Sequence, residues 1–179
     1  WNAATKQHNM HKGDQAAFLR DGGSTLFPEE IALLDDVRGK TLVHLQCNAG
    51  QDTLSIASQL GAVVTGVDIS DEAVGFAQQL AAESGIPGTF IRSDIYDWFA
   101  HNTTPYDVAF SSYGAIIWLS DLKVWARGVA AALKPGGRFV LVEFHPIISV
   151  LDGPLNGAWK HANDYMGGRL YSFETGVGD

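Results

Sequence analysis

The sequence predicts an α/β fold in which a doubly wound parallel sheet is covered by helices on both faces. Between residues 41 and 146, short apolar runs alternate with longer stretches of helical pattern. Strict alternation of strand and helix is typical of a parallel sheet joined by right-handed crossovers. The chain has 179 residues, of which 46% are hydrophobic and 18% charged, a size and composition that suit one globular domain.

Five segments have the length and composition of buried strands, at 41–46, 62–68, 88–94, 107–113 and 138–144. The second, AVVTGVD, is rich in β-branched residues, which favour strands. The fifth, RFVLVEF, follows the run LKPGG, whose proline and glycines end the preceding helix.

Helical segments separate these strands, at 52–60, at 71–84 and from 121 to about 133. Ser70 is placed to cap the second helix, and Asp71 and Glu72 lie in its first turn, where the helix dipole favours acids. Gly85 ends that helix. A further helix begins near Pro28, ahead of the sheet.

We therefore expect a single domain with three parts. Residues 1–40 form a helical segment ahead of the sheet, and residues 41–146 form the core. Residues 147–179 form a Gly-rich tail of weak periodicity, with a short strand expected near 169–173, RLYSF.

The net charge and the composition disfavour a nucleic-acid or membrane partner. The formal net charge of −8 disfavours a nucleic-acid partner, which requires a basic surface. No apolar run approaches the ~20 residues that span a bilayer, so no membrane partner is expected. The start shows no secretory signal pattern, and the single cysteine, Cys47, excludes an internal disulfide; both favour a cytoplasmic location. The oligomeric state is not predicted.

Ligands of a doubly wound sheet bind beyond the carboxyl ends of its strands, where three loops of this chain would meet. The first loop is QCNAGQD, 46–52. Gly50 and Asn48 tolerate the positive φ that lets backbone approach a ligand. Gln46 does not share this tolerance, but its amide can bind a polar ligand. The alternative is an ordinary strand-to-helix turn.

Two acids follow the next two strands. Asp68 lies 18 residues after Gly50, and a carboxylate there can accept hydrogen bonds from both hydroxyls of a ribose. Its alternative role is to start a turn or cap a helix. Asp94 can accept the exocyclic amine of an adenine while Ile95 packs on the ring, or it can simply cap the short helical turn that follows. Together the three loops predict one pocket for an adenosine.

With the run LKPGGRFVLVEFHP, 133–146, these features resemble the class I S-adenosylmethionine-dependent methyltransferases over about residues 38–146. LVHLQCNAGQDTLS, SSYGAIIWLSDL and EFHP are similar to a bacterial subgroup that acts on small molecules. The resemblance implies a Rossmann-like sheet of strand order 3-2-1-4-5. It also implies S-adenosyl-L-methionine as cofactor, S-adenosyl-L-homocysteine as product, and methyl transfer to a small-molecule acceptor by in-line displacement. Residues 1–40 are then expected to form a lid over the cofactor, and residues 147–179 to lie on the acceptor side.

The chain departs from the family pattern in two places. The first loop of the family usually reads acidic-x-Gly-x-Gly-x-Gly, and here His44, Gln46 and Asn48 replace the acid and the first two glycines, while Gly50 keeps the last. The family usually adds two strands after the fifth. The tail after residue 146 has too little strand pattern for both, so we expect an abbreviated sheet or a chain that continues.

The resemblance assigns cofactor-binding roles by position. The residues implied are Gln46, Asn48, Ala49 and Gly50 at the methionine and ribose, Asp68 at the ribose hydroxyls, Ile69, Asp94 and Ile95 at the adenine, and Ser111 and Ser112 at the methionine and the transferred methyl.

A general base is needed only if the acceptor loses a proton on attack. The candidates are His145 in EFHP and Tyr113 in SSYG, although His145 is also readily explained as a loop histidine. His44, inside the first strand, is expected to be buried and satisfied. No metal site is predicted, because the histidines lack paired ligand spacing.

Three other functions compete with this reading. A non-catalytic methyltransferase-like binding domain is suggested by the replaced glycines, although Asp68 and Asp94 are intact. An NAD-dependent oxidoreductase would need Gly-x-Gly-x-x-Gly at the first turn, which QCNAGQ does not supply. Amino-methylating DNA enzymes carry an Asn/Asp-Pro-Pro-aromatic sequence after the fourth strand, where this chain has SSYG.

Overall fold

The protein folds around one parallel sheet of five strands. The computed structural model describes Asn2, Thr5, Asn9, residues 13–145, Ile147, and residues 150–152 and 160–161. The strands are β1 (Thr41–Leu45), β2 (Val63–Asp68), β3 (Thr89–Arg92), β4 (Tyr106–Ser112) and β5 (Leu133–Val142). Their order is β3-β2-β1-β4-β5 and every neighbouring pair is parallel. The predicted fold class and strand order are confirmed.

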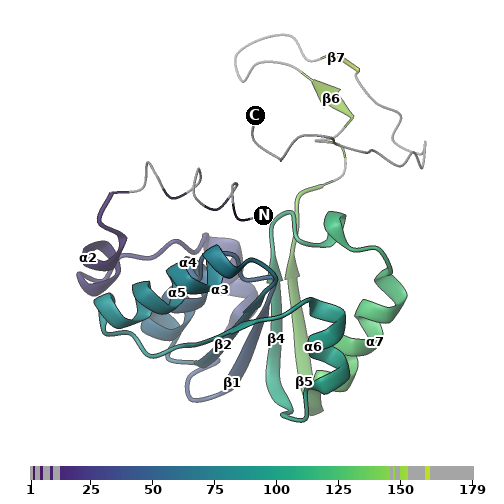
Figure 1. Ribbon diagram of the computed structural model, residues 1–179, viewed down its shortest axis with the longest axis horizontal. Helices are drawn as coiled ribbons and strands as arrows, with labels where there is room; N and C mark the ends of the chain where they lie inside the picture. Colours follow the sequence, from purple (N-terminus) through teal and green to yellow (C-terminus); the bar gives the residue numbers. More distant parts are fainter. Residues whose placement is uncertain are drawn as a thin grey trace.

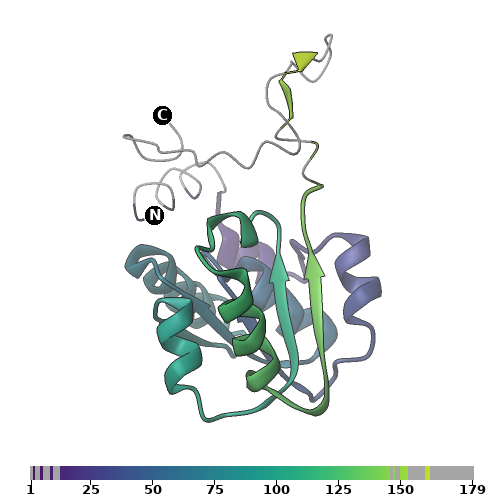
Figure 2. The same cartoon turned by 90° about the vertical axis from the view of Figure 1, so that its right-hand side faces the viewer.

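Helices cover both faces of the sheet. They are α2 (Gln15–Arg20), α3 (Pro28–Leu34), α4 (Gln51–Ser55) with η1 (Ile56–Leu60), α5 (Asp71–Ser84), α6 (Ile95–His101), η2 (Ile116–Trp118) and α7 (Leu122–Ala132). Figure 2 shows α3 on one side of the sheet and α6 and α7 on the other.

Alternate strand residues supply the two halves of the core. In β1, Leu42 packs with residues of α3 and η1, whereas Val43 and Leu45 pack with α6 and α7. A third apolar cluster joins α2, α4 and α5 above β3. This period-two division of a strand between opposite faces is what a sheet buried on both sides requires.

Caps set several helix boundaries. Ser70 Oγ accepts a hydrogen bond from Ala73 N and begins α5, and Gly85, at φ 72°, ends it. Asp121 Oδ1 accepts from the amides of Lys123 and Val124 and begins α7. These ends lie where the sequence placed them, because the capping chemistry is local.

Two boundaries differ from expectation. The helix expected over 52–60 is α-helical only as far as Ser55 and continues as a π-helical turn, in which Ser58 Oγ donates to the Ser55 carbonyl. Strand β5 begins at Leu133 and not at residue 138, because Leu133 already pairs with Tyr106. A register shift in the β4–β5 pairing accommodates the Pro-Gly-Gly run that follows Leu133.

The tail contributes a separate element in the described residues. β6 (Leu151–Asp152) and β7 (Lys160–His161) pair antiparallel as a two-stranded sheet of their own. The strand expected at 169–173 lies outside the described residues. Within the described part of the chain, no helix combines the length and apolarity needed to cross a bilayer.

Because the five strands are parallel, their carboxyl ends lie at one edge of the sheet. Figure 1 shows the strands of the main sheet running side by side, and Figure 2 shows the arrowheads of β4 and β5 at the same upper edge. The loops that follow β1, β2, β3 and β4 therefore converge there.

A substitution at Gly50 tests how tightly the residues beneath this edge are packed. The φ of Gly50 is 76°, and an added Cβ would lie 2.7 Å from both Ala77 Cβ and Phe90 Cε1. We expect Gly50→Ala to lower the free energy of unfolding by about 1–3 kcal/mol, measured by urea denaturation. Gly75→Ala, in the exposed middle of α5 with open space around its Cα, is the control and should stabilise by about 0.5–1 kcal/mol. Equal effects of the two substitutions would contradict the packing argument.

Candidate functional site at the carboxyl edge of the sheet

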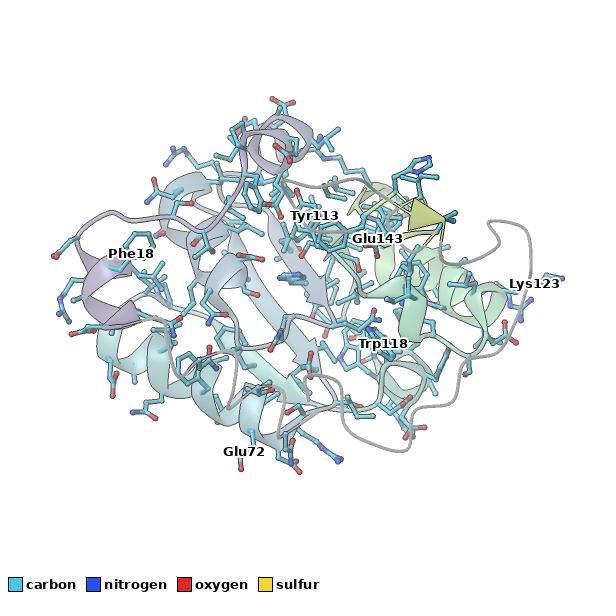
Figure 3. All side chains as sticks on the ribbon, turned by 90° about the horizontal axis from the view of Figure 1, so that it is seen from above. Phe18, Glu72, Tyr113, Trp118, Lys123 and Glu143 are labelled. Atoms are coloured by element: carbon cyan, nitrogen blue, oxygen red, sulfur yellow. The ribbon has the colours of Figure 1, made fainter. Side chains whose placement is uncertain are left out.

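A cavity of about 890 Å³ opens at the carboxyl edge, within the range of small-molecule sites. Eight of the residues singled out in the sequence line it: Gln46, Asn48, Asp68, Ile69, Asp94, Ile95, Ser112 and Tyr113. Figure 3 looks onto this edge from above, with Tyr113 and Glu143 close together and Trp118 farther away. Ala49, Gly50, Ser111 and His145 do not line the cavity.

The loop after β1 is left-handed at alternate residues. Gln46, Asn48 and Gly50 have φ of 53°, 49° and 76°. Asn48 and Gly50 behave as the sequence predicts. The expectation for Gln46 is wrong, because Gln46 also takes positive φ. Its side chain explains this: Nε2 donates to the Ala115 carbonyl at 3.1 Å, and Oε1 accepts from Trp125 Nε1 at 3.2 Å.

Asp68 joins the loops after β1 and β2. Its Oδ2 accepts from Asn48 N at 2.8 Å and its Oδ1 accepts from Ser70 N at 2.9 Å. Partial burial raises the pKa of this carboxyl above its usual value. The same two backbone hydrogen bonds act in the opposite direction but do not cancel the effect of burial. The carboxylate has further lone pairs with which to accept hydroxyls, since each oxygen can accept more than one hydrogen bond.

The structure confirms the capping role considered for Asp94 and places the residue at the cavity. It caps α6 through Oδ1, which accepts from Tyr96 N at 2.8 Å, and it lines the cavity beside Ile95. Ile69 is 41% exposed and faces the same cavity from the end of β2. Two carboxylates and two isoleucines thus face one space from the ends of adjacent strands.

The buried His44 and the half-buried Ser112 form a polar pair in the wall. His44 Nδ1 lies 2.8 Å from Thr53 Oγ1, and His44 Nε2 lies 3.3 Å from Ser112 Oγ. The imidazole is almost completely buried, and this lowers its pKa to about 3. His44 is therefore buried and satisfied, as the sequence predicts. Ser111, in contrast, points away into the core and is fully buried.

Tyr113 belongs to an aromatic group on the far side of the cavity. Its ring contacts Phe144 at 5.1 Å and meets Phe27 edge-on at 5.6 Å. Its hydroxyl donates to Glu29 Oε1 at 3.1 Å. Burial and the neighbouring acids raise the pKa of Tyr113 to about 12. At neutral pH the phenol is therefore a hydrogen-bond donor and a poor general base.

His145 lies beyond the cavity wall. It is exposed, and its Nδ1 accepts from Ile147 N at 3.2 Å. Glu143, two residues earlier, has a clearer structural role. Its carboxylate accepts hydrogen bonds from the amides of Gly114 and Ile116, at the start of the loop after β4.

The sequence did not single out several residues that line the cavity: Thr5, Asp52, Ile117, Leu119 and Phe144. Ile117 and Leu119 lie in AIIWLS, an apolar run in a predicted loop. Apolar residues are unexpected in an exposed loop, and this could have indicated that the run lines a binding cavity. Phe144 is 53% exposed. Among the described residues lining the cavity are three aspartates and no lysine or arginine, an electrostatic environment that favours a cationic ligand.

The buried His44 predicts how stability depends on pH. Its pKa falls from 6.5 to about 3 on folding, so below pH 6.5 the unfolded chain takes up a proton that the native protein does not. Stability from this group is complete above pH 6.5 and is lost as the pH falls toward 3. The loss is up to about 1.4 kcal/mol per pH unit.

The substitution His44→Gln removes the titrating ring. Chemical denaturation between about pH 7 and pH 4 should show a shallower fall of the free energy of unfolding in the variant than in the wild type. Parallel curves for the two proteins would contradict the assignment.

Sequence comparisons identify the family of the chain. A family model described as a methyltransferase domain matches residues 43–137. The ubiquinone biosynthesis O-methyltransferase of Vibrio vulnificus is 36% identical over 108 residues, covering 60% of this chain and 45% of that protein. The protein of the same name from Caulobacter vibrioides is 29% identical over 135 residues, covering 75% and 53%. The chain spans about half the length of the curated relatives it matches.

Structural comparison gives the same family. The crystal structure of an S-adenosylmethionine-dependent methyltransferase from Mesorhizobium loti matches with a TM-score of 0.62 and 29% identity, covering 83% of this chain and 68% of that chain. The matched family model covers more than half of the chain, and the sheet order is the one that the resemblance implied. The chain belongs to the class I S-adenosylmethionine-dependent methyltransferases.

Proposed function

We propose that the protein binds S-adenosyl-L-methionine in the carboxyl-edge cavity and transfers its methyl group to a small-molecule acceptor. One observation carries the proposal. Asp68 and Asp94, at the ends of the adjacent strands β2 and β3, face one cavity of about 890 Å³ together with Ile69 and Ile95. Carboxylates for hydroxyls and an amine, with apolar side chains for a planar ring, fit an adenosine.

The residues present fit the rest of that cofactor as well. Ser112 offers a hydroxyl, and Asp52 and Asp68 supply negative charge for a ligand that carries a sulfonium and an ammonium group. Asn48 is exposed and has positive φ, a backbone conformation that allows close approach to a ligand. When bound, the cofactor supplies an activated methyl group, and the protein supplies position and orientation.

Described residues near the start of the chain lie at the same cavity or contact its lining. Thr5 lines it, and Ser70 Oγ donates to Asn2 Oδ1 at 2.7 Å. Gln51, at the start of α4, donates through Nε2 to Asn9 and Gln15. These contacts tie the start of the chain to the loops after β1 and β2, and they support a role for residues 1–40 as a cover over the cofactor.

The acceptor side of the cavity suits an uncharged, apolar molecule. Ile117, Trp118 and Phe144 are all exposed at its rim, with Tyr113 behind them. An anionic acceptor would meet the three aspartates of the cavity without a compensating lysine or arginine among the described lining residues. Two relatives are named as O-methyltransferases, so an oxygen on such a molecule is the acceptor atom we favour.

Proton removal is not assigned to Tyr113, because its raised pKa and its hydrogen bond to Glu29 make it a donor. His145 remains the proposed base only if the acceptor brings the histidine into contact. The single cysteine, Cys47, is free and buried, which is consistent with work in a reducing compartment such as the cytoplasm.

Calorimetric titration with S-adenosylhomocysteine tests the cofactor proposal. We expect micromolar binding that Asp68→Ala weakens at least about tenfold, because two ribose hydroxyls lose a charged acceptor. Asp71→Ala is the control: it removes the same charge three residues away, where the carboxylate pairs with Arg92 at 2.9 Å outside the cavity. Binding of NAD in place of S-adenosylhomocysteine would contradict the proposal.

A matched pair of probes tests the acceptor class. Production of S-adenosylhomocysteine is measured with protocatechuate methyl ester, which is neutral, and with protocatechuate, its anionic counterpart. We expect turnover of the ester at a rate at least about tenfold higher, since the anion faces uncompensated negative charge. A preference for the anion would overturn the assignment of a neutral acceptor.

A further inference from the structure

The loop after β4 is tied at three consecutive backbone groups by side chains from two other strand ends. Glu143, after β5, accepts from the amides of Gly114 and Ile116. Gln46, after β1, donates from Nε2 to the carbonyl of Ala115, which lies between them, at 3.1 Å. The residues that follow, Ile117, Trp118, Leu119 and Ser120, line the acceptor side of the cavity.

Gln46 is itself part of the loop that borders the cofactor side. Its neighbour Cys47 donates from its amide to the Val67 carbonyl of β2 at 2.9 Å, and Asn48 N is held by Asp68. The Gln46 amide has both ends occupied, since Oε1 accepts from Trp125 Nε1 on α7 at 3.2 Å. The side chain is therefore fixed in orientation by the loop after β4 and by α7.

The backbone at Gln46 points to a reason for this residue. Positive φ is disfavoured for any residue with a Cβ, and such conformations persist where the surrounding structure over-determines them. Glycine would adopt this φ without strain, but glycine has no amide with which to hold Ala115 and Trp125. Glutamine at this position therefore has a strained backbone, but its side chain connects two loops.

We propose that Gln46 is a positioning residue that couples the cofactor loop, 46–50, to the acceptor loop, 113–120. Ligand bound at Asp68 stabilises the arrangement of Asn48 and Gln46, and Gln46 transmits it through Ala115 to the residues of the acceptor wall. Coupling of this kind is reciprocal, so an ordered acceptor loop also favours the ligand. The identity of the ligand rests on the proposed function, whereas the connection itself does not.

Hydrogen–deuterium exchange of peptides covering 113–120 tests the inference in the full chain, with and without S-adenosylhomocysteine. The variant is Gln46→Gly, which keeps the backbone conformation accessible and removes the amide. Without ligand, we expect exchange in this loop to be about tenfold faster in the variant than in the wild type, because a buried carbonyl loses its partner.

Saturating ligand should slow exchange in the loop further in the wild type but not in Gln46→Gly. The matched control is Asn48→Gly, which makes the same replacement at a second left-handed position of the same loop and should leave exchange of the ligand-free loop unchanged. The Trp125 indole N–H resonance, identified by its loss in Trp125→Phe, should shift in Gln46→Gly.

Equal exchange in the wild type and Gln46→Gly would overturn the connection. Slowing by ligand to the same extent in both proteins would overturn the coupling. Failure of the wild type to bind S-adenosylhomocysteine would overturn the proposed function and the ligand-linked half of this inference, while the comparison without ligand still decides whether Gln46 holds the loop.

Discussion

The Asp68 carboxylate accepts hydrogen bonds from the loops after both β1 and β2, at Asn48 N and Ser70 N. These loops follow neighbouring strands that are paired as far as Leu45 and Val67, and the carboxylate extends the connection into the loops beyond that pairing. The contact with Asn48 N fixes the left-handed loop over 46–50 against the end of β2. The contact with Ser70 N fixes the residue that caps α5. The cavity is shaped by this one shared acceptor, and the ligand-binding role proposed for Asp68 uses lone pairs that the fold leaves available.

Much of the fold can be predicted from the sequence, because short stretches of residues determine where many helices and strands begin and end. Ser70 and Gly85 mark the ends of α5 through capping and a left-handed turn, and both are found in those roles. Strand β5 begins earlier than expected because the pairing of Leu133 with Tyr106 depends on a partner far away in the chain. The π-helical turn after Ser55 has no strong local signal.

The site divides in the same way. Asp68, Asp94 and their following isoleucines line the cavity as expected, because a residue that ends a parallel strand is placed at the ligand edge by topology alone. Ser111 and Ser112 illustrate the limit: both end β4, but the pleat sends Ser111 into the core and Ser112 to the cavity. The positive φ of Gln46 was not predictable from the residue type, since it depends on Ala115 and Trp125, which only the tertiary fold brings near.

The departures from glycine in the first loop are compatible with the proposed cofactor site. Asn48 keeps the left-handed backbone by its own tolerance, and Gln46 keeps it by contacts. His44, in the place of the usual acid, contributes a neutral imidazole bound to Thr53 and Ser112, and the negative charge of the cavity comes from Asp52, Asp68 and Asp94 instead. The acidic character that a sulfonium ligand requires is thus retained at different positions.

The most direct test of this account is a crystal structure of the protein grown with S-adenosylhomocysteine. The account places both ribose hydroxyls on the Asp68 carboxylate, the adenine between Ile69 and Ile95 with its amine toward Asp94, and the homocysteine toward Ser112. A nucleoside bound elsewhere, or bound in the cavity without contact to Asp68, would contradict it.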